Sequence, residues 1–437
     1  MLQLPIKARY RTYFFIKKII KKLLPIKMWL VIKKYLPKSE LNHQVEEINL
    51  AEWNNYRKHA KYSFQPNTLE KGINLIGYLQ ASTGLGEAAR SSHTALTTTN
   101  LPCELIDFEE NIPNNQKVSQ AYIQAEPPTF KYRFNLFHIN PPQLSSLWNV
   151  FSPAQLSSHY NIGVWYWEMP EFPNEWNKYF NLVDEIWVAS QFVKESIEKN
   201  SQIPVIIIPP CIQVQTQPDL KRADFGLPEE PYLFLCAYDV LSSQQRKNPQ
   251  GAIDAFKMAF ENTNTSVGLV IKINNAIENF SAVAKLKEAT RDYPNCYFLE
   301  DTYSRHKFNS LISLMDTYIS LHRAEGFGLI AAESMYLGKP VIMTRWSGNV
   351  DFMTEDNCCG VDYELIKVGP NDSVYDANQQ WADPNLEQAA EYMKRLTKEK
   401  AYNRVIGKNA KKTMTSQFSP ERLGQLILLR IDDIVHI

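Results

Sequence analysis

Two glutamates on either side of a glycine-rich turn are the residues of this sequence best suited to chemistry. Glu325 precedes the turn, and Glu333 follows it in an apolar segment that leads to Gly-Lys-Pro-Val-Ile. Carboxylates accept hydrogen bonds from hydroxyl groups, such as those of a ribose and a hexose. The helix predicted from Leu329 begins with unpaired amides, which suit a phosphate. The segment therefore predicts a nucleotide-sugar site, and the alternative is an ordinary α/β turn with two surface glutamates.

A basic pair, Arg246 and Lys247, follows the apolar run 232–238. Fixed cations at the end of a strand would stabilise negative charge that develops on a leaving diphosphate. The alternative interpretation is a solvated basic turn that caps the next helix. The pair is thus a second candidate for the chemistry of the site.

An aromatic strand end offers a third candidate. The run 162–167 ends in Trp-Tyr-Trp and is followed at once by Glu168. Flat apolar rings beside a hydrogen-bonding group are common in ligand sites, although Trp167 could equally belong to the core and Glu168 to a surface turn. His138 ends another apolar run and is a candidate contact for a sugar or an acceptor, but a single His at such a place is more often structural.

A glycine-rich turn also precedes the predicted helix that runs to Leu96. Gly84 and Gly86 would permit a ligand to approach the backbone closely, or they form only a tight turn. The turn lacks the third glycine of the dinucleotide fingerprint, and Asp107 is the nearest acid at the expected distance. An NAD-dependent oxidoreductase is therefore disfavoured.

Alternating strands and helices must position these residues. A chain of 437 residues exceeds the roughly 250–300 residues of a single core, so two domains are expected. Alternation of short apolar runs with helical segments predicts parallel sheets that are covered on both faces. The connection between the domains is predicted at 213–231, which is rich in Gln, Pro and charge. The predicted strands are 73–78, 103–107, 134–138, 162–167, 185–189 and 204–208 in the first series, and 232–238, 267–273, 296–299, 317–321 and 340–344 in the second.

The Glu-x7-Glu segment followed by Gly-Lys-Pro-Val resembles the motif of glycosyltransferase family 4, the large retaining family with mannosyl-, glucosyl- and N-acetylglucosaminyltransferases. The resemblance covers roughly 72–430 and implies an α/β fold of GT-B architecture, with two Rossmann-like domains facing each other across a cleft. It implies retaining transfer of a hexose, of mannose or glucose type, from a UDP-sugar or GDP-sugar to a glycan or lipid-linked acceptor. No metal and no cofactor are expected. A nucleotide-sugar epimerase of the same architecture and a non-catalytic nucleotide-sugar-binding protein remain alternatives.

The resemblance also implies roles for residues. Glu333 would bind the ribose, and Glu325 the donor sugar. Two departures stand out: the family's usual Arg lies about five residues earlier, at Ser242, and Trp167 or Glu168 stands where many relatives have a His. The latter variant is similar to bacterial polysaccharide-assembly transferases. The implied catalytic residues are Lys247, Arg246, Glu325 and Glu168; the implied donor-binding residues are Gly84, Gly86, Phe327, Gly328, Leu329, Glu333, Asn349 and Leu299; and His138 and Trp167 are candidate acceptor or sugar contacts.

Four segments are predicted. They are a basic amphipathic extension at 1–45, an acceptor domain at 46–215, a nucleotide-sugar domain at 216–417 and a helix at 418–437 that returns to the first domain. Residues 1–40 contain eleven Lys or Arg and one acid. Such a segment could lie on an anionic membrane, act as a nucleic-acid-binding arm or pack on the fold. We favour membrane contact, and no nucleic-acid partner is expected.

The cysteines and the apolar runs bear on location. Six cysteines show no paired spacing with His partners, so no zinc site is expected and a reducing cytoplasmic location is favoured. No apolar run approaches the ~20 residues that a membrane-spanning helix needs. The beginning of the chain also lacks the pattern of a cleavable signal. A cytoplasmic protein, peripheral on the inner face of the membrane through 1–40, is therefore expected.

Overall fold

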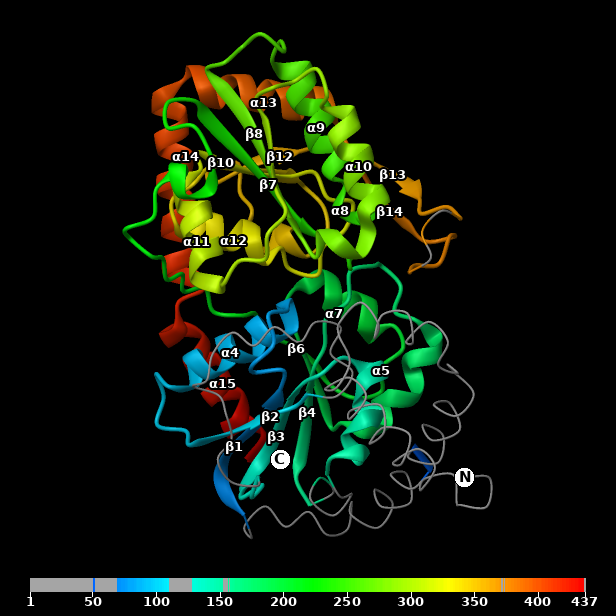
Figure 1. The fold of residues 1–437 in the computed structure, drawn as a ribbon. Coiled ribbons are helices and arrows are strands. Elements are labelled where there is room, and N and C mark those ends of the chain that lie inside the picture. Colours follow the sequence, from blue (N-terminus) through cyan, green and yellow to red (C-terminus); the bar gives the residue numbers. More distant parts are fainter. Residues whose placement is uncertain are drawn as a thin grey trace, which may run out of the picture.

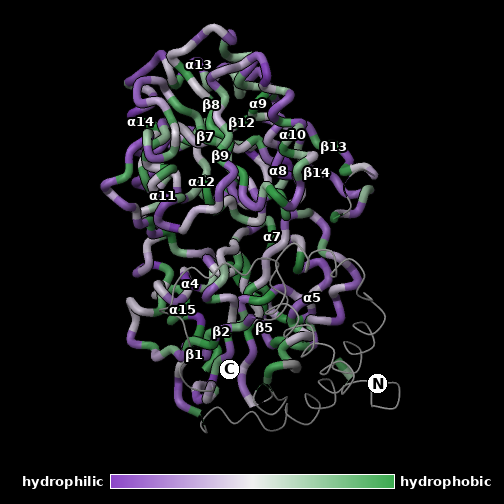
Figure 2. Tube along the Cα trace, viewed as in Figure 1, coloured by the Kyte–Doolittle hydropathy of each residue, from purple (hydrophilic) through white to green (hydrophobic). Residues whose placement is uncertain are grey.

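The computed structural model describes residues 69–109, 128–151, 158–370 and 374–435, together with residues 50, 51, 156 and 372. Two α/β units, each built on its own six-stranded sheet, lie one above the other in Figure 1. Hydrophobic residues gather along the central strands of both units, and hydrophilic residues on the outer loops (Figure 2). The predicted extension at 1–45 lies outside the described residues.

The N-terminal sheet is parallel, with the strand order β2-β1-β3-β4-β5-β6. The central strand β3 is buried along its whole length, as expected when helices cover both faces of a parallel sheet. The strands are β1 (Glu70–Gly77), β2 (Cys103–Asp107), β3 (Tyr132–His138), β4 (Tyr160–Val164), β5 (Glu185–Val188) and β6 (Val205–Ile207). The helices are α4 (Gly84–Leu96), α5 (Pro141–Leu144), η2 (Ser145–Asn149), η3 (Asn174–Leu182) and α7 (Gln191–Glu198).

The C-terminal sheet is also parallel, with the order β12-β11-β10-β7-β8-β9. An antiparallel hairpin of β13 and β14 follows it. The strands are β7 (Tyr232–Asp239), β8 (Val267–Asn274), β9 (Cys296–Leu299), β10 (Thr317–Ser320), β11 (Val341–Thr344), β12 (Cys359–Val361), β13 (Tyr363–Lys367) and β14 (Gln380–Pro384). The helices are η4 (Arg222–Phe225), α8 (Gln244–Lys247), α9 (Pro249–Ala259), η5 (Ala276–Asn279), α10 (Phe280–Ala289), α11 (Arg305–Leu314), α12 (Leu329–Tyr336), η6 (Gly348–Phe352), α13 (Leu386–Lys398), α14 (Lys400–Gln417) and α15 (Pro420–Val435).

The strand order reverses once in each sheet, between β1 and β3 and between β7 and β10. Ligands of open parallel sheets bind outside the carboxyl ends of the strands at such a reversal. The segments that leave these ends meet between the two units. The Ser190 hydroxyl, after β5, donates to the Gly326 carbonyl, after β10, at 2.7 Å. The topology thus places a candidate site at the boundary between the units.

The last helix, α15, leaves the C-terminal unit and lies beside α4 of the N-terminal unit (Figure 1). Arg430 on α15 donates from Nε to Glu185 of β5 at 2.9 Å. The helix therefore joins the two units at a second place, away from the site.

The main differences between the predicted elements and the structure concern β4, β12 and the β13–β14 hairpin. The strand predicted at 162–167 ends at Val164, and the ring of the next residue, Trp165, stacks on Phe172 with centroids 6.0 Å apart. Neither β12 nor the β13–β14 hairpin was predicted. Among the described residues, no helix combines the length and the apolar composition needed to cross a membrane.

Candidate active site

Glu325 lies between β10 and α12, beside both residues of the basic pair. Its carboxylate forms an ion pair with Lys247 and lies 3.6 Å from a terminal nitrogen of Arg246. Burial alone would raise the pKa of Glu325, but Lys247, then Arg246 and His322, lower it to about 2. Glu325 is therefore ionised at neutral pH, and the structure brings together three of the four residues predicted to be catalytic.

Arg246 joins this group to the fourth, Glu168 of the N-terminal unit. Arg246 is 4% exposed, and one terminal nitrogen donates to the Ala324 carbonyl at 2.8 Å. The other lies 3.7 Å from a carboxylate oxygen of Glu168. Burial would lower the pKa of Arg246, but Glu168 and Glu325 raise it, so the guanidinium keeps its charge between two carboxylates.

Glu333 is the fifth of the eight residues of α12 and is 4% exposed. One carboxylate oxygen forms an ion pair with Arg305, and the other, Oε2, has no hydrogen-bond partner in the part of the chain that the structure describes. The Arg305 Nε lies 3.5 Å from Glu87, which is on α4 of the N-terminal unit. Burial would raise the pKa of Glu87, but Arg305 and then Arg90 lower it. A second arginine is thus shared between a carboxylate of each unit.

The backbone at Gly348 packs closely against the turn between the two glutamates. A Cβ on Gly348 would lie 2.0 Å from the Gly326 carbonyl oxygen, so only glycine fits there without movement. Gly328 has φ +92°, a conformation that side chains other than glycine rarely adopt. It leads directly into Leu329, the first residue of α12, whose first amides face the turn.

Several residues predicted to bind the donor use their side chains inside the fold. The Asn349 amide oxygen pairs with His322 Nε2 at 2.9 Å, and its nitrogen donates to the Thr344 carbonyl at 2.8 Å. The Phe327 ring packs on Phe352 with centroids 5.2 Å apart. These side chains position the turn and leave its backbone as the surface available to a ligand.

The remaining predicted residues lie at strand and helix ends. Gly84 and Gly86 begin α4, where the Thr83 hydroxyl accepts from the Gly86 amide at 3.2 Å. Leu299 is the buried last residue of β9. The Trp167 indole donates to the Glu171 carbonyl at 2.8 Å.

His138 ends β3 and is 1% exposed. Neither of its ring nitrogens has a hydrogen-bond partner among the described residues. Burial lowers the pKa of His138 to about 3. The imidazole is therefore neutral at physiological pH.

Sequence reasoning missed Arg305, Glu87 and Tyr375. Tyr375 lies in the loop of the β13–β14 hairpin, and its hydroxyl donates to Glu168 at 3.2 Å. Arg305 begins α11 after a serine cap, a sequence pattern that marks a helix start and gives no sign of a partner in another unit. All three residues could be found only from their contacts in the tertiary structure.

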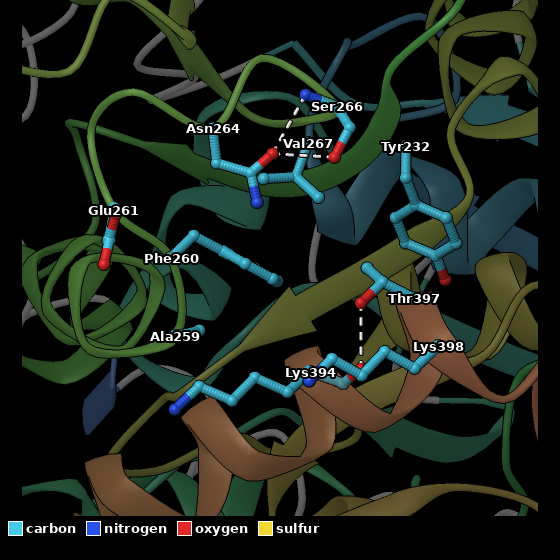
Figure 3. A pocket seen from close by; sticks show the side chains of 10 residues that line it. All are labelled: Tyr232, Ala259, Phe260, Glu261, Asn264, Ser266, Val267, Lys394, Thr397 and Lys398. Atoms are coloured by element: carbon cyan, nitrogen blue, oxygen red, sulfur yellow. Dashed lines mark hydrogen bonds between the residues drawn. The ribbon is translucent and has the colours of Figure 1, made fainter.

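A cavity of about 510 Å³ lies elsewhere (Figure 3). It opens at the amino end of the C-terminal sheet, next to Tyr232 of β7 and Val267 of β8. None of the residues predicted for the site lines it. Within the described ranges, no group of three or more His, Cys, Asp or Glu residues is arranged to hold a metal ion.

Comparisons with known proteins bear on the family and the fold. Residues 219–413 match the family described as glycosyl transferases group 1. The chain is 27% identical over 275 residues to alpha-1,3/1,6-mannosyltransferase ALG2 of Candida glabrata, in an alignment covering 54% of this chain and 58% of that protein. The match thus spans little more than half of that relative.

Solved structures share the fold at low identity. Sucrose-phosphate synthase of Thermosynechococcus elongatus superposes with a TM-score of 0.60 at 16% identity, over 84% of this chain and 99% of that chain. Anabaena HepE, solved with UDP and glucose, gives a TM-score of 0.59 at 13% identity, over 83% and 100% of the two chains. The C-terminal unit thus matches the model of the group 1 glycosyltransferases, and the two units together have the GT-B fold.

Proposed function

We propose that this protein transfers a hexose from a nucleotide-diphosphate sugar to a hydroxyl acceptor, with retention of configuration at the anomeric carbon. The observation that carries the proposal is the pairing of Glu325 with Lys247 and Arg246 at the point where the strand order of the C-terminal sheet reverses. A carboxylate for sugar hydroxyls and cations for a leaving diphosphate meet there.

The donor would be held by the beginning and the middle of α12. The unpartnered oxygen of Glu333 is free to accept from a ribose hydroxyl. The first amides of the helix, after Gly328, would donate to the diphosphate together with the Lys247 ammonium. Leu299, at the end of β9, lies where the resemblance places the base. The nucleotide would therefore lie across the carboxyl ends of β9 and β10.

The chemical step follows from these positions. The bond between the anomeric carbon and the diphosphate oxygen breaks on the face where the acceptor hydroxyl enters, and the acceptor oxygen bonds to that carbon. A leaving phosphate oxygen takes the acceptor's proton, because no dedicated base is evident among the described residues of the site. Lys247 and Arg246 stabilise the charge that grows on the diphosphate, which makes their contribution larger in the transition state than in the ground state.

Substrate classes follow from the resemblance and the relatives. The sugar is of mannose or glucose type, the nucleotide is UDP or GDP, and the acceptor is a glycan or a lipid-linked glycan. The named relative is a mannosyltransferase, which favours mannose. The basic segment 1–40 would bring the enzyme to an anionic membrane on its cytoplasmic face, where a lipid-linked acceptor would be presented.

Nucleotide-sugar binding and turnover test the proposal. A ligand of the native state raises the melting temperature, so UDP-glucose and GDP-mannose are compared in a thermal-shift assay. Glu333→Gln should weaken donor binding by about 1–3 kcal/mol through lost charge-assisted hydrogen bonds. Lys247→Ala should lower donor hydrolysis more than it lowers binding. Exposed positions provide matched controls, Glu387→Gln and Lys285→Ala.

The products separate the alternatives. Release of free sugar or of a glycoside supports the transferase, whereas a changed sugar still attached to its nucleotide would indicate an epimerase. Binding without any turnover would indicate a binding protein. Kinetics unchanged in both Glu333→Gln and Lys247→Ala would refute the site.

A further inference from the structure

The β13–β14 hairpin is inserted between the last strand of the C-terminal sheet and α13, and it projects from the side of that unit (Figure 1). It is anchored beside the basic pair. The Ala382 amide donates to the Arg323 carbonyl at 3.0 Å, and Arg323 forms an ion pair with Asp383 at 2.7 Å. The Ser243 hydroxyl, which also caps the short helix of Arg246, donates to Asp372. The hairpin is therefore attached to the loop that carries the catalytic cations.

The same hairpin reaches the N-terminal unit. The Glu171 amide donates to the Gln379 side chain at 3.2 Å. The rings of Tyr375 and Trp167 meet edge to face with centroids 5.6 Å apart. Tyr375 and Trp381 belong to the same buried apolar cluster as Trp167. The hairpin thus spans the boundary between the units on the side of Glu168.

Tyr375 stands at the centre of these contacts and is 9% exposed. Its ring lies 6.0 Å from the Arg246 guanidinium, and its hydroxyl donates to one carboxylate oxygen of Glu168. Burial, followed by the charge of Glu168, raises the pKa of Tyr375 far above its ordinary value, so the hydroxyl stays protonated and remains a donor. The other oxygen of Glu168 faces Arg246. Glu168 is therefore held from two sides.

We propose that Tyr375 is a positioning residue, which fixes the Glu168 carboxylate beside Arg246 through its hydroxyl and is delivered there by the hairpin. The inference rests on the proposed function and on the catalytic role predicted for Glu168 from the sequence. A glutamate side chain has several rotatable bonds, and holding it in one rotamer costs conformational entropy that a fixed donor offsets. Small displacements of such a group lower rate strongly while leaving nucleotide contacts in place.

Tyr375→Phe removes the hydroxyl and keeps the ring that packs on Trp167 and Trp381. The full-length protein is compared for donor hydrolysis, UDP or GDP affinity and melting temperature. The matched control is Tyr363→Phe, an exposed tyrosine on the same hairpin. We expect Tyr375→Phe to lower kcat about 10-fold or more, since a hydrogen bond to a charged group is lost. Nucleotide affinity and melting temperature should stay close to those of the wild type, and Tyr363→Phe should change none of the three.

A double-mutant cycle with Glu168→Gln tests whether Tyr375 acts through Glu168. If it does, adding Tyr375→Phe to Glu168→Gln lowers kcat little further. The inference would be overturned if the two substitutions lowered kcat independently, so that their fold-losses multiplied in the double variant. It would also be overturned if Tyr375→Phe kept the wild-type kcat or lost only nucleotide affinity. An inactive wild type would overturn both the proposed function and this inference. Equal turnover by the wild type and Tyr375→Phe would overturn this inference alone.

Discussion

Lowering the pH should destabilise this protein through His138, whose buried imidazole has no hydrogen-bond partner among the residues that the structure describes. Burial lowers the pKa of His138 to about 3 in the folded state, against about 6.5 in an unfolded chain. Between these two values the unfolded state binds a proton that the folded state does not. The contribution of the neutral His138 to the free energy of unfolding is therefore fully present above pH 6.5 and is lost as the pH falls from 6.5 towards 3.

The size of the effect follows from the same two values. A pH of 5 is about 1.5 units below the pKa of the unfolded imidazole. Protonation of the unfolded state therefore lowers the free energy of unfolding by about 2 kcal/mol, at roughly 1.4 kcal/mol per unit. His138→Asn removes the titration at a similar side-chain size. The free energy of unfolding is measured by urea titration at pH 7.5 and 5.0, with tryptophan fluorescence as the probe. Wild type should lose about 2 kcal/mol more than His138→Asn between the two pH values.

The control is His306→Asn, which changes an exposed histidine. It should lose as much stability on acidification as the wild type does. Equal losses in wild type and His138→Asn would refute the reasoning, because they would mean that the imidazole keeps its ordinary pKa in the folded state. A neutral imidazole offers one donor and one acceptor, so any contact of His138 with a sugar would be hydrogen bonding and not proton donation.

Two further predictions concern the turn and the N-terminal segment. Gly348→Ala places a Cβ against the Gly326 carbonyl, so it should lower both the melting temperature and donor affinity; unchanged values in a thermal-shift assay would contradict the close approach. Deleting residues 1–40 should abolish sedimentation with anionic liposomes at low salt and spare donor hydrolysis, since each Lys or Arg contributes about 1 kcal/mol near an anionic surface. Continued sedimentation of the truncated protein, or failure of the full-length protein to sediment, would exclude membrane binding by this segment.

Much of each sheet could be predicted from the sequence. The strands at 103–107 and 296–299 and the helix from Leu329 to Tyr336 have the predicted bounds. Parallel strands buried on both faces are continuous apolar runs, and a glycine before a helix marks where the chain turns. The spacing of Glu325 and Glu333 across that turn could also be recognised from the sequence, because both residues belong to one local segment.

The partners of these glutamates were decided by the tertiary structure. Arg305 lies 28 positions before Glu333 along the chain, and its other partner, Glu87, comes from a different unit. Tyr375 reaches Glu168 across 207 positions, by way of a hairpin whose exposed strand β13 lacks the alternation of a half-buried strand. Local pattern records which face of an element is apolar. The order in which strands assemble decides which distant side chains then meet at their carboxyl ends, and no short window of sequence contains that order.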